Sequence, residues 1–302
     1  MNRWNRRQVL AAAAALGVAP GSVMGERSSM LSKKIPSSGE ALPVIGLGTY
    51  SVFDVSGTPD EIATRKDILA RLTGAGGSLI DTSPMYNRSE KIIGDVIDAG
   101  IDRDTVFLAT KVWTDGADAG ATQMQRSADL MRTRIIDLVQ VHNLRDTAAH
   151  MPTIRAWQEE GHIRYSGLTH YTAGAHAALA REMVAFRPDF IQINYSLGER
   201  EAEERLLPQA RDQGVAVLIN RPFQAGRLFR AVAGHELPDF AREFADSWGQ
   251  YFLKFIISHP AVTCVIPATS KPHHMADNLG AGFGNMPDPG QRRRMAEYFK
   301  NL

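Results

Sequence analysis

The sequence predicts an α/β protein whose large domain is a (β/α)8 TIM barrel preceded by an N-terminal hairpin. Eight short, apolar, β-like runs alternate with amphipathic stretches along the chain. The runs are almost continuously apolar, which is typical of strands that are covered on both faces. An open doubly wound sheet would need a glycine-rich phosphate turn after its first strand, and neither G-x-G-x-x-G nor a Walker A sequence occurs. The barrel is therefore the predicted fold.

The strands are expected at regular intervals. In chain order they are PVIGLGT (43–49), SLIDT (78–82), VFLATK (106–111), DLVQVH (137–142), YSGLTH (165–170), FIQINY (190–195), VAVLIN (215–220) and TCVIPA (263–268). Two of the intervening stretches repeat apolar residues at helical spacing: Ile92, Ile93, Val96 and Ile97, then Phe244, Trp248, Phe252 and Phe255. A hairpin at 33–44 is expected before the first strand, and a last helix at 289–302 after the barrel.

The composition is that of an ordinary globular protein. Of 302 residues, 44% are hydrophobic, and 34 basic residues balance 33 acidic ones. The net charge of +1 and the lack of charge runs argue against a nucleic-acid partner. The single cysteine, Cys264, excludes an intramolecular disulfide and is expected to be inert core. No H-E-x-x-H sequence, cysteine cluster or paired histidine spacing indicates a metal site.

Residues 1–25 have the layout of an export signal and are set apart from the barrel domain expected at 32–302. Three arginines lie within residues 1–7, the apolar run VLAAAAALGVA (9–19) follows, and no acidic residue precedes Glu26. That run is too short for a stable membrane span. Arg6 and Arg7 in NRRQVL resemble the twin-arginine signal, which predicts a periplasmic protein and the twin-arginine translocase as a partner during export. The alternative is an uncleaved helix or a degenerate leader on a cytoplasmic protein.

Ionisable side chains end three successive expected strands. Asp81, Lys111 and His142 close the second, third and fourth strands, and Tyr86 lies in the loop after Asp81. Barrel enzymes carry their chemistry at the C-terminal ends of the strands, so these are the candidate catalytic residues. Each alone has a structural alternative: a turn-capping Asp, a Lys that reaches solvent, a satisfied core His and a loop Tyr. Together they are hard to explain in a plain core, because buried charge is costly unless it is paired.

Carbonyl reduction is a reaction that needs these four groups. Hydride transfer to a carbonyl carbon leaves negative charge on the oxygen, and an acid must donate a proton there. A phenol is a poor donor at neutral pH because its unperturbed pKa is about 10. We expect the Lys111 ammonium to lower the pKa of Tyr86, and Asp81 to anchor Lys111. His142 would donate a hydrogen bond that orients the substrate oxygen.

From about residue 33 onward, the chain resembles the aldo/keto reductases. The resemblance lies in GLGTY, LIDTSPMYNRSEKIIG, FLATKV, DLVQVH, GHIRYSGLTH, FIQINYSL and IPATSKPHHMADNLGAG. The catalytic Asp, Tyr, Lys and His of that family fall on Asp81, Tyr86, Lys111 and His142. The resemblance implies the barrel fold and an enzyme that uses NADP(H), in preference to NAD(H), to reduce an aldehyde or ketone to an alcohol.

The resemblance also implies a cofactor that lies extended across the C-terminal end of the barrel. The implied contacts are Gly48, Thr49, Thr169, His170, Gln192, Arg221, Pro222, Phe223, Gln224, Gly226, Arg227, Thr269, Ser270, Lys271, His274, Asp277 and Asn278. Gln192 is expected to hold the carboxamide, and the loop at 221–228 the pyrophosphate. Asp277 and Asn278 match the residues that contact adenine.

The chain departs from the family pattern beside the nicotinamide. Thr169 and His170 replace the usual Ser-Asn pair. Asn220 aligns with a tyrosine that frequently stacks on the nicotinamide. Thr169 keeps the hydroxyl, whereas the stacking contact is absent or is supplied elsewhere.

A second departure concerns the adenosine 2′-phosphate. The usual Lys and Arg that read this group become Ala268 and His274. Thr269 and Ser270 still offer hydroxyls, and Lys271 offers a displaced cation, which favours NADPH over NADH.

Aromatic residues after the first and third strands are the expected walls of the substrate pocket: Tyr50, Phe53 and Trp113. The alternative is that some of them are surface or core aromatics. Little sequence follows Asn278, which suggests an open site that accepts many small carbonyl compounds. The main alternative function is a nicotinamide-binding regulatory or redox-sensing protein with slow turnover. A third, an unrelated barrel lyase or hydrolase, is disfavoured by TSKPHHMADN.

Overall fold

Eight parallel strands form the central sheet of the computed structural model, which describes residues 29–302. They are β3 (Leu47–Gly48), β4 (Leu79–Asp81), β5 (Phe107–Val112), β6 (Ile136–His142), β7 (Ile163–Thr169), β8 (Phe190–Asn194), β9 (Ala216–Asn220) and β10 (Cys264–Val265). Each strand pairs with the next one along the chain. Parallel bridges from Ile45 to Val265 and from Gly48 to Ala268 join the first strand to the last, so the sheet closes and the predicted barrel is confirmed.

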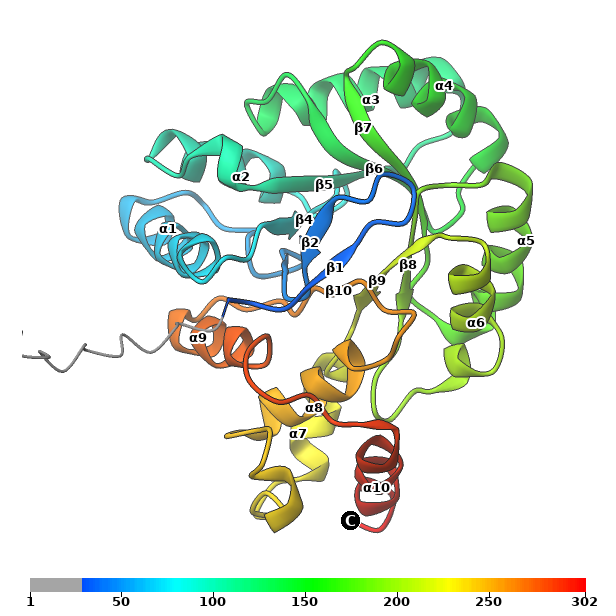
Figure 1. Ribbon diagram of the computed structural model, residues 1–302. Coiled ribbons are helices and arrows are strands. Elements are labelled where there is room, and N and C mark those ends of the chain that lie inside the picture. Colours follow the sequence, from blue (N-terminus) through cyan, green and yellow to red (C-terminus); the bar gives the residue numbers. More distant parts are fainter. Residues whose placement is uncertain (1–28) are drawn as a thin grey trace, which may run out of the picture.

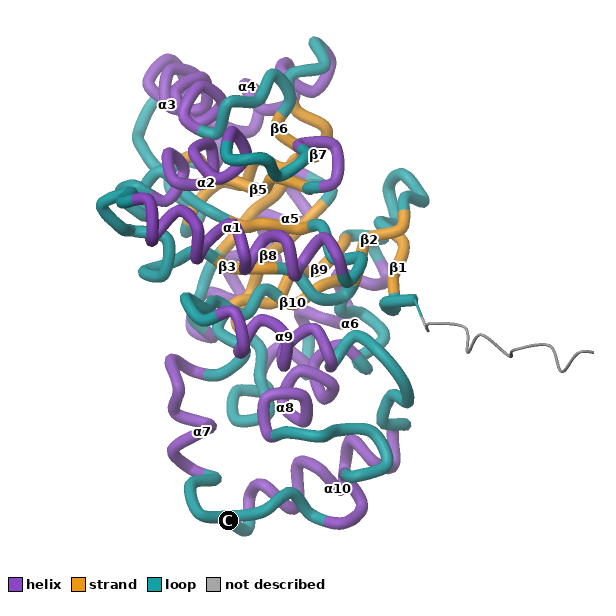
Figure 2. Tube along the Cα trace, turned by 90° about the vertical axis from the view of Figure 1, so that its left-hand side faces the viewer, coloured by secondary structure: helices purple, strands orange, loops and turns teal. Residues whose placement is uncertain are grey.

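Helices connect the strands and surround them (Figure 1). They are α1 (Pro59–Gly74), α2 (Ser89–Asp98), α3 (Ala117–Leu130), α4 (Thr147–Glu159), α5 (His176–Phe186), α6 (Leu206–Asp212), α7 (Arg227–Ala231), α8 (Trp248–Ile257), α9 (Pro272–Gly280) and α10 (Pro289–Lys300). Both views show α7, α8 and α10 gathered beyond β10 (Figures 1 and 2). The helix expected over Phe244 begins later, at Trp248, because the Ser247 side chain caps it by accepting from the backbone N–H of Gln250.

The predicted hairpin consists of β1 (Ser32–Lys34) and β2 (Ala41–Pro43), which pair antiparallel. Ile35 and Leu42 pack with the apolar residues of the barrel interior. The hydroxyl of Tyr165, near the start of β7, donates to Glu40 Oε2 over 2.6 Å. The hairpin therefore covers the N-terminal end of the barrel, and Figure 1 shows it lying across the strands. The functional groups are left to the opposite end.

The side chains that face the barrel interior change from apolar to polar along several strands. Residues two apart on a strand point to the same side. Three strands carry such a pair in the interior: Leu79 and Asp81, Ala109 and Lys111, Phe190 and Gln192. The apolar member of each pair lies in the interior cluster with Cys264, which is buried as predicted. The polar member comes last, so polar groups accumulate at the C-terminal end.

The predicted export signal lies outside the described residues. Within 29–302, none of the helices is both long and apolar enough to cross a membrane.

Candidate active site

A buried ion pair lies at the C-terminal end of the barrel. Lys111 Nζ donates to Asp81 Oδ2 and to the backbone carbonyl of Thr82, each over 2.7 Å. The Lys111 side chain is 0% exposed and that of Asp81 is 3% exposed. Asp81 Oδ1 accepts from the side-chain amides of Gln140, over 3.1 Å, and Gln192, over 2.7 Å. Both carboxylate oxygens are therefore hydrogen-bonded, which is what makes a buried charge tolerable.

Tyr86 lies beside this pair, in the loop between β4 and α2. Lys111 Nζ is 5.2 Å from the centroid of the Tyr86 ring. Burial raises the pKa of the Tyr86 phenol, and the nearby Lys111 charge, which acts to lower this pKa, does not outweigh it. The expectation that Lys111 brings the pKa of Tyr86 below its ordinary value is therefore wrong. The ammonium acts in the expected direction, but the loss of water costs the phenolate more.

Lys111 itself remains an ammonium. Burial acts to lower its pKa, but the Asp81 carboxylate and the hydrogen bonds to Asp81 and Tyr86 act the other way, and the pKa is raised. The ion pair thus persists at neutral pH, and the positive charge stays next to the phenol.

His142 ends β6 with its ring next to Tyr86. The ring centroids of the two residues are 5.9 Å apart, and their planes are nearly perpendicular at 84°. Burial, together with the charge of Lys111, lowers the pKa of His142 to about 3. The imidazole is therefore neutral at physiological pH. Its Nδ1 lies 2.9 Å from the hydroxyl of Ser83.

Four residues predicted from the sequence thus converge at one place. Asp81, Lys111 and His142 come from the neighbouring strands β4, β5 and β6, and Tyr86 comes from the loop after β4. Strand adjacency explains the convergence, since Asp81, Lys111 and His142 are each the last inward-facing position of their strand and Tyr86 follows β4 by a few residues.

Two of the three expected pocket walls border these residues. The Tyr50 ring is 5.1 Å from that of Tyr86 and is 64% exposed, which puts it at the rim. The half-buried Trp113 ring is 6.5 Å from that of His142. Phe53 corrects the prediction: it is 0% exposed and packs within the main hydrophobic core, so it does not border an open pocket.

The residues expected near the nicotinamide form one hydrogen-bonded group. Besides Asp81, Gln192 contacts Gln140, and its Oε1 lies 3.3 Å from Thr169 Oγ1 and 3.4 Å from Asn220 Nδ2. Gln192 is therefore held in a single orientation at the floor of the site.

Other residues expected in this region have local partners. The Thr49 hydroxyl donates to the backbone carbonyl of Asp81 over 3.0 Å. Gly48 pairs with Asp81 in the sheet. His170 Nδ1 accepts the backbone N–H of Tyr171 over 3.0 Å, so its side chain orders the loop after β7.

The loop expected to hold the pyrophosphate has an unusual backbone. Four residues between β9 and α7 have positive φ angles of 50–83°: Arg221, Gln224, Ala225 and Gly226. Anion-binding backbone nests alternate left- and right-handed residues, and Gly226 (φ 83°) followed by Arg227 (φ −60°) has this alternation. The N–H groups of Gln224 and Gly226 are already bonded to the carbonyls of Arg221 and Phe223.

The side chains of this loop divide into inward and outward groups. Pro222 is buried, Phe223 packs against Phe229 at 4.8 Å, and the Gln224 amide donates to Ser196 Oγ over 2.9 Å. These side chains secure the loop to the core. The side chains of Arg221 and Arg227 are exposed, and the Arg221 guanidinium lies 5.8 Å from the centroid of the Tyr171 ring.

The segment expected to bind the 2′-phosphate precedes and begins α9. Thr269 Oγ1 accepts from the backbone N–H of Lys271 over 3.1 Å, which caps the turn. The side chains of Ser270, Lys271 and His274 are exposed. Partial burial, with His273 and Lys271 nearby, lowers the pKa of His274, so Lys271 is the cation of this group at neutral pH.

The two residues expected at adenine are half-buried or buried. Asp277 accepts from Ser247 Oγ over 2.8 Å and from Gln250 Nε2 over 3.0 Å, and so ties α9 to α8. Asn278 is 5% exposed. Their contact with adenine stays a prediction.

Sequence reasoning missed three groups that complete the site. Gln140 bonds to Asp81, the Thr82 carbonyl bonds to Lys111, and Ser83 bonds to His142. Gln140 had a usable signal, because it lies two residues before His142 and so on the same face of β6. Gly167 on β7 makes room for it: a Cβ at Gly167 would lie 2.7 Å from Gln140 Cγ.

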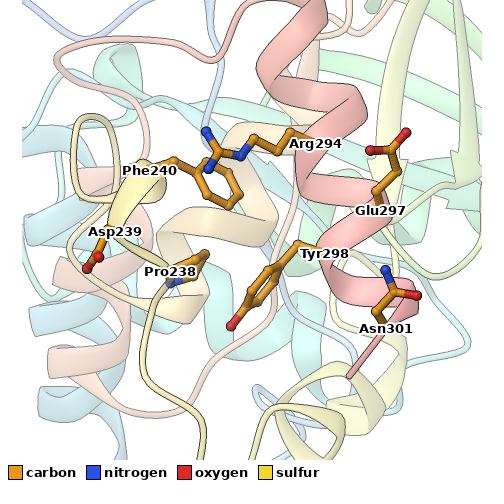
Figure 3. A pocket seen from close by; sticks show the side chains of 7 residues that line it. All are labelled: Pro238, Asp239, Phe240, Arg294, Glu297, Tyr298 and Asn301. Atoms are coloured by element: carbon orange, nitrogen blue, oxygen red, sulfur yellow. The ribbon is translucent and has the colours of Figure 1, made fainter.

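A surface hollow of about 360 Å³ lies elsewhere, between the segment at 238–240 and α10 (Figure 3). It is lined by Pro238, Asp239, Phe240, Arg294, Glu297, Tyr298 and Asn301. None of the predicted site residues lines it. In the described part of the chain, no group of three or more His, Cys, Asp or Glu residues is placed to hold a metal ion.

Comparison with known proteins decides the family. The Aldo/keto reductase family model matches residues 44–288. The chain belongs to the aldo/keto reductase family. The predicted family and the prediction of an enzyme of this family are therefore confirmed.

The relatives of this aldo/keto reductase include named bacterial enzymes. It is 30% identical to methylglyoxal reductase YeaE of Escherichia coli over 258 residues. This alignment covers 81% of this chain and 87% of the relative. It is 32% identical over 198 residues to aldo-keto reductase YhdN of Bacillus subtilis, where 58% of this chain matches 56% of the relative.

Solved structures share the barrel. An aldo/keto reductase from Klebsiella pneumoniae in complex with NADP and acetate superposes with a TM-score of 0.74 at 23% identity, over 86% of this chain and 93% of that one. An aldo-keto reductase from the same organism in complex with NADPH gives a TM-score of 0.73 at 24% identity, over 89% and 96%. At these identities the likeness concerns the fold.

Proposed function

We propose that the protein is an NADP(H)-dependent reductase that converts a small aldehyde or ketone to the alcohol, with Tyr86 as the general acid. The observation that carries this proposal is the convergence of Tyr86, Lys111, Asp81 and His142 at the C-terminal end of the barrel. Membership of a reductase family supports the same reaction.

Tyr86 is suited to donate the proton. Its raised pKa keeps the phenol protonated at neutral pH, and the Lys111 ammonium, which acts to lower this pKa, favours release of the proton to a developing oxyanion. As the carbonyl carbon accepts hydride, the carbonyl electron pair moves to oxygen, and the phenolic proton is transferred to that oxygen. The phenolate that remains is stabilised by the Lys111 ammonium, which Asp81 and the Thr82 carbonyl hold in place.

His142 would orient the substrate. A neutral imidazole can donate one N–H hydrogen bond to the carbonyl oxygen without competing with Tyr86 as an acid. The substrate oxygen would then lie between the phenol and the imidazole. Tyr50 and Trp113 border this space and limit access to the reacting carbon.

The chain has groups that fit NADP(H), and the structural neighbours bound to NADP or NADPH support this cofactor. When bound, NADPH supplies the hydride. The alternating backbone at 226–227 and exposed Arg221 and Arg227 suit a pyrophosphate. Ser270 and Lys271 at the start of α9 suit a 2′-phosphate, because a helix N-terminus favours an anion. Gln192 offers a fixed amide to the carboxamide.

The test is the Tyr86→Phe variant, with Tyr298→Phe on α10 as the matched control. Turnover of carbonyl substrates, followed by loss of NADPH absorbance, should disappear in Tyr86→Phe and persist in the control. NADPH affinity, measured by fluorescence, should stay nearly unchanged in both. Methylglyoxal is a suitable first substrate, given the name of the Escherichia coli relative. Retained activity in Tyr86→Phe would reassign the acid, and tight cofactor binding without turnover in the wild type would favour the regulatory alternative.

We also propose export by the twin-arginine route, which rests on Arg6, Arg7 and the apolar run at 9–19. That route carries folded proteins, so the barrel would cross with its cofactor already bound. Cell fractionation should find the protein in the periplasm, and changing both Arg6 and Arg7 to lysine should retain it in the cytoplasm. Cytoplasmic wild-type protein would contradict the proposal.

A further inference from the structure

Ser83 and His142 form a buried hydrogen bond behind the proposed substrate site. Ser83 Oγ lies 2.9 Å from His142 Nδ1. The two residues are 0% and 5% exposed, so water does not compete for this contact. Which atom donates decides the position of the imidazole proton, and therefore what His142 presents to a substrate.

The hydrogen-bond partners of the serine decide the direction. Ser83 Oγ accepts the backbone N–H of Met85 over 3.3 Å. A serine hydroxyl has one hydrogen to donate. Among the described residues, His142 Nδ1 is the partner of Ser83 Oγ that can accept this hydrogen. If Nδ1 carried the proton instead, the buried hydroxyl hydrogen would have no acceptor, which is unfavourable. Ser83 therefore donates to Nδ1.

We propose that Ser83 is a positioning residue that holds His142 in the tautomer with its proton on Nε2, so that the neutral ring donates to the substrate carbonyl. This inference rests on the proposed carbonyl reduction. With Nδ1 occupied as an acceptor, the single proton of a neutral imidazole must lie on Nε2. Nε2 makes no hydrogen bond to any described residue, and so remains available to a ligand.

The tautomer matters because, in a neutral imidazole, the protonated nitrogen donates a hydrogen bond and the unprotonated nitrogen accepts one. Nε2–H stabilises the negative charge that develops on the carbonyl oxygen during reduction. An unprotonated Nε2 would point its lone pair at the same oxygen and repel it. The low pKa of His142 means that protonation of both nitrogens does not solve this problem at neutral pH.

The same short segment fixes the other members of the site. Asp81 and the Thr82 carbonyl hold Lys111, and the Ser83 carbonyl accepts the backbone N–H of Tyr86 over 2.9 Å. Residues 81–83 therefore place the ammonium, the phenol and the imidazole relative to one another. Ser83 links the imidazole to this segment.

The decisive measurement is the tautomer of His142 by NMR on protein labelled with 15N-histidine, recorded near neutral pH. The His142 signals are assigned by their loss in His142→Gln, which is needed because the chain has 9 histidines. Wild type should show a protonated Nε2 and an unprotonated Nδ1. In Ser83→Ala, the Nδ1 signal should shift or show a mixture of tautomers. A protonated Nδ1 or a charged ring in the wild type would overturn the proposal.

Kinetics provides the second test, with a matched control on the next helix. Ser89 is also 0% exposed, and its hydroxyl has no partner among the described residues, so Ser89→Ala should leave turnover unchanged. Ser83→Ala should lower kcat roughly tenfold and leave the NADPH dissociation constant unchanged. The loss should be smaller than the roughly hundredfold loss caused by removing an oxyanion donor outright, because the imidazole is still present.

A double-mutant cycle separates the proposed role from a general structural one. In a His142→Gln background, Ser83→Ala should cost much less than tenfold, because the amide has no tautomer to fix. Equal losses in both backgrounds would overturn the proposal. The NMR result also stands apart from the activity: a wild type that reduces no carbonyl would refute the proposed function, whereas the tautomer would still decide the role of Ser83.

Discussion

Replacing Asp81 with asparagine should destabilise the protein by about 3–5 kcal/mol, because it leaves a buried ammonium without its counter-charge. The Lys111 side chain is 0% exposed. After the substitution it would keep its hydrogen bond to the Thr82 carbonyl, which carries no charge. Water cannot compensate for the lost carboxylate at such a position. The loss should therefore exceed that of an ordinary surface ion pair.

Gln140 and Gln192 should bring the loss of stability in Asp81→Asn to the upper part of the range of about 3–5 kcal/mol. An asparagine at position 81 has one oxygen and one NH2 group. If its oxygen faces Lys111, its NH2 group faces the side-chain amides of Gln140 and Gln192, which already donate to this position. Gln192 cannot reverse its own amide without breaking its contacts with Thr169 and Asn220. The substitution thus brings donors face to face in a buried site.

Urea unfolding followed by circular dichroism measures this change. At a slope of about 3 kcal/mol per molar, the midpoint should fall by about 1 M or more. Asp67→Asn is the control, because the Asp67–Arg71 pair spans 3.0 Å at 46% and 45% exposure and its loss should cost below about 1 kcal/mol.

Adding Lys111→Met to Asp81→Asn should restore part of the lost stability, since it removes the stranded charge. A loss below about 1 kcal/mol in Asp81→Asn, or a double variant no more stable than the single one, would refute the reasoning.

Three further predictions concern pH, the cofactor and the substrate. His142 stays neutral above a pKa of about 3 and the raised pKa of Tyr86 keeps the phenol protonated, so kcat/KM for reduction should be flat from about pH 5 to 8; an inflection near 6.5 that vanishes in His142→Gln would contradict this. Lys271→Ala should weaken NADPH binding more than NADH binding, measured by fluorescence titration, because the proposed partner of this cation is the 2′-phosphate, which NADH lacks; equal effects would mean that this phosphate is read elsewhere. Trp113→Ala should raise KM for bulky aldehydes by removing a wall next to His142, with NADPH affinity as the unchanged control; an unaltered KM would take Trp113 out of the pocket.

The order and type of the elements could be read from the chain because they depend on local pattern. Apolar runs such as FIQIN and AVLIN, separated by helical spacing, were sufficient to predict β8 and β9. The residues at which strands begin and end could not be read from local pattern in the same way. The run at 263–268 contributes only Cys264–Val265 as a strand, because hydrogen bonds to neighbouring strands, rather than composition, decide where a strand stops.

The sequence predicted which residues form the site better than it predicted how deeply each of them is buried. Tyr86 and Lys111 could be identified as neighbours from their strand ends, but the direction of the pKa of Tyr86 depends on how much water the folded chain excludes. Phe53 has a sequence position like that of a pocket wall, and it is the packing of the first loop against the core that removes it from the surface.

The sequence by itself determined the closed barrel, the family and the four ionisable groups at the strand ends, because strand period and strand adjacency follow from the spacing of residues along the chain. Only the tertiary structure decided which of those groups are paired and in which protonation state. Gln140 and Gln192 reach Asp81, and Ser83 reaches His142, across 59 or more positions of the chain, and no local pattern specifies such contacts. Hydrogen bonding inside a closed barrel depends on three-dimensional neighbours, and those exist only once the sheet has closed.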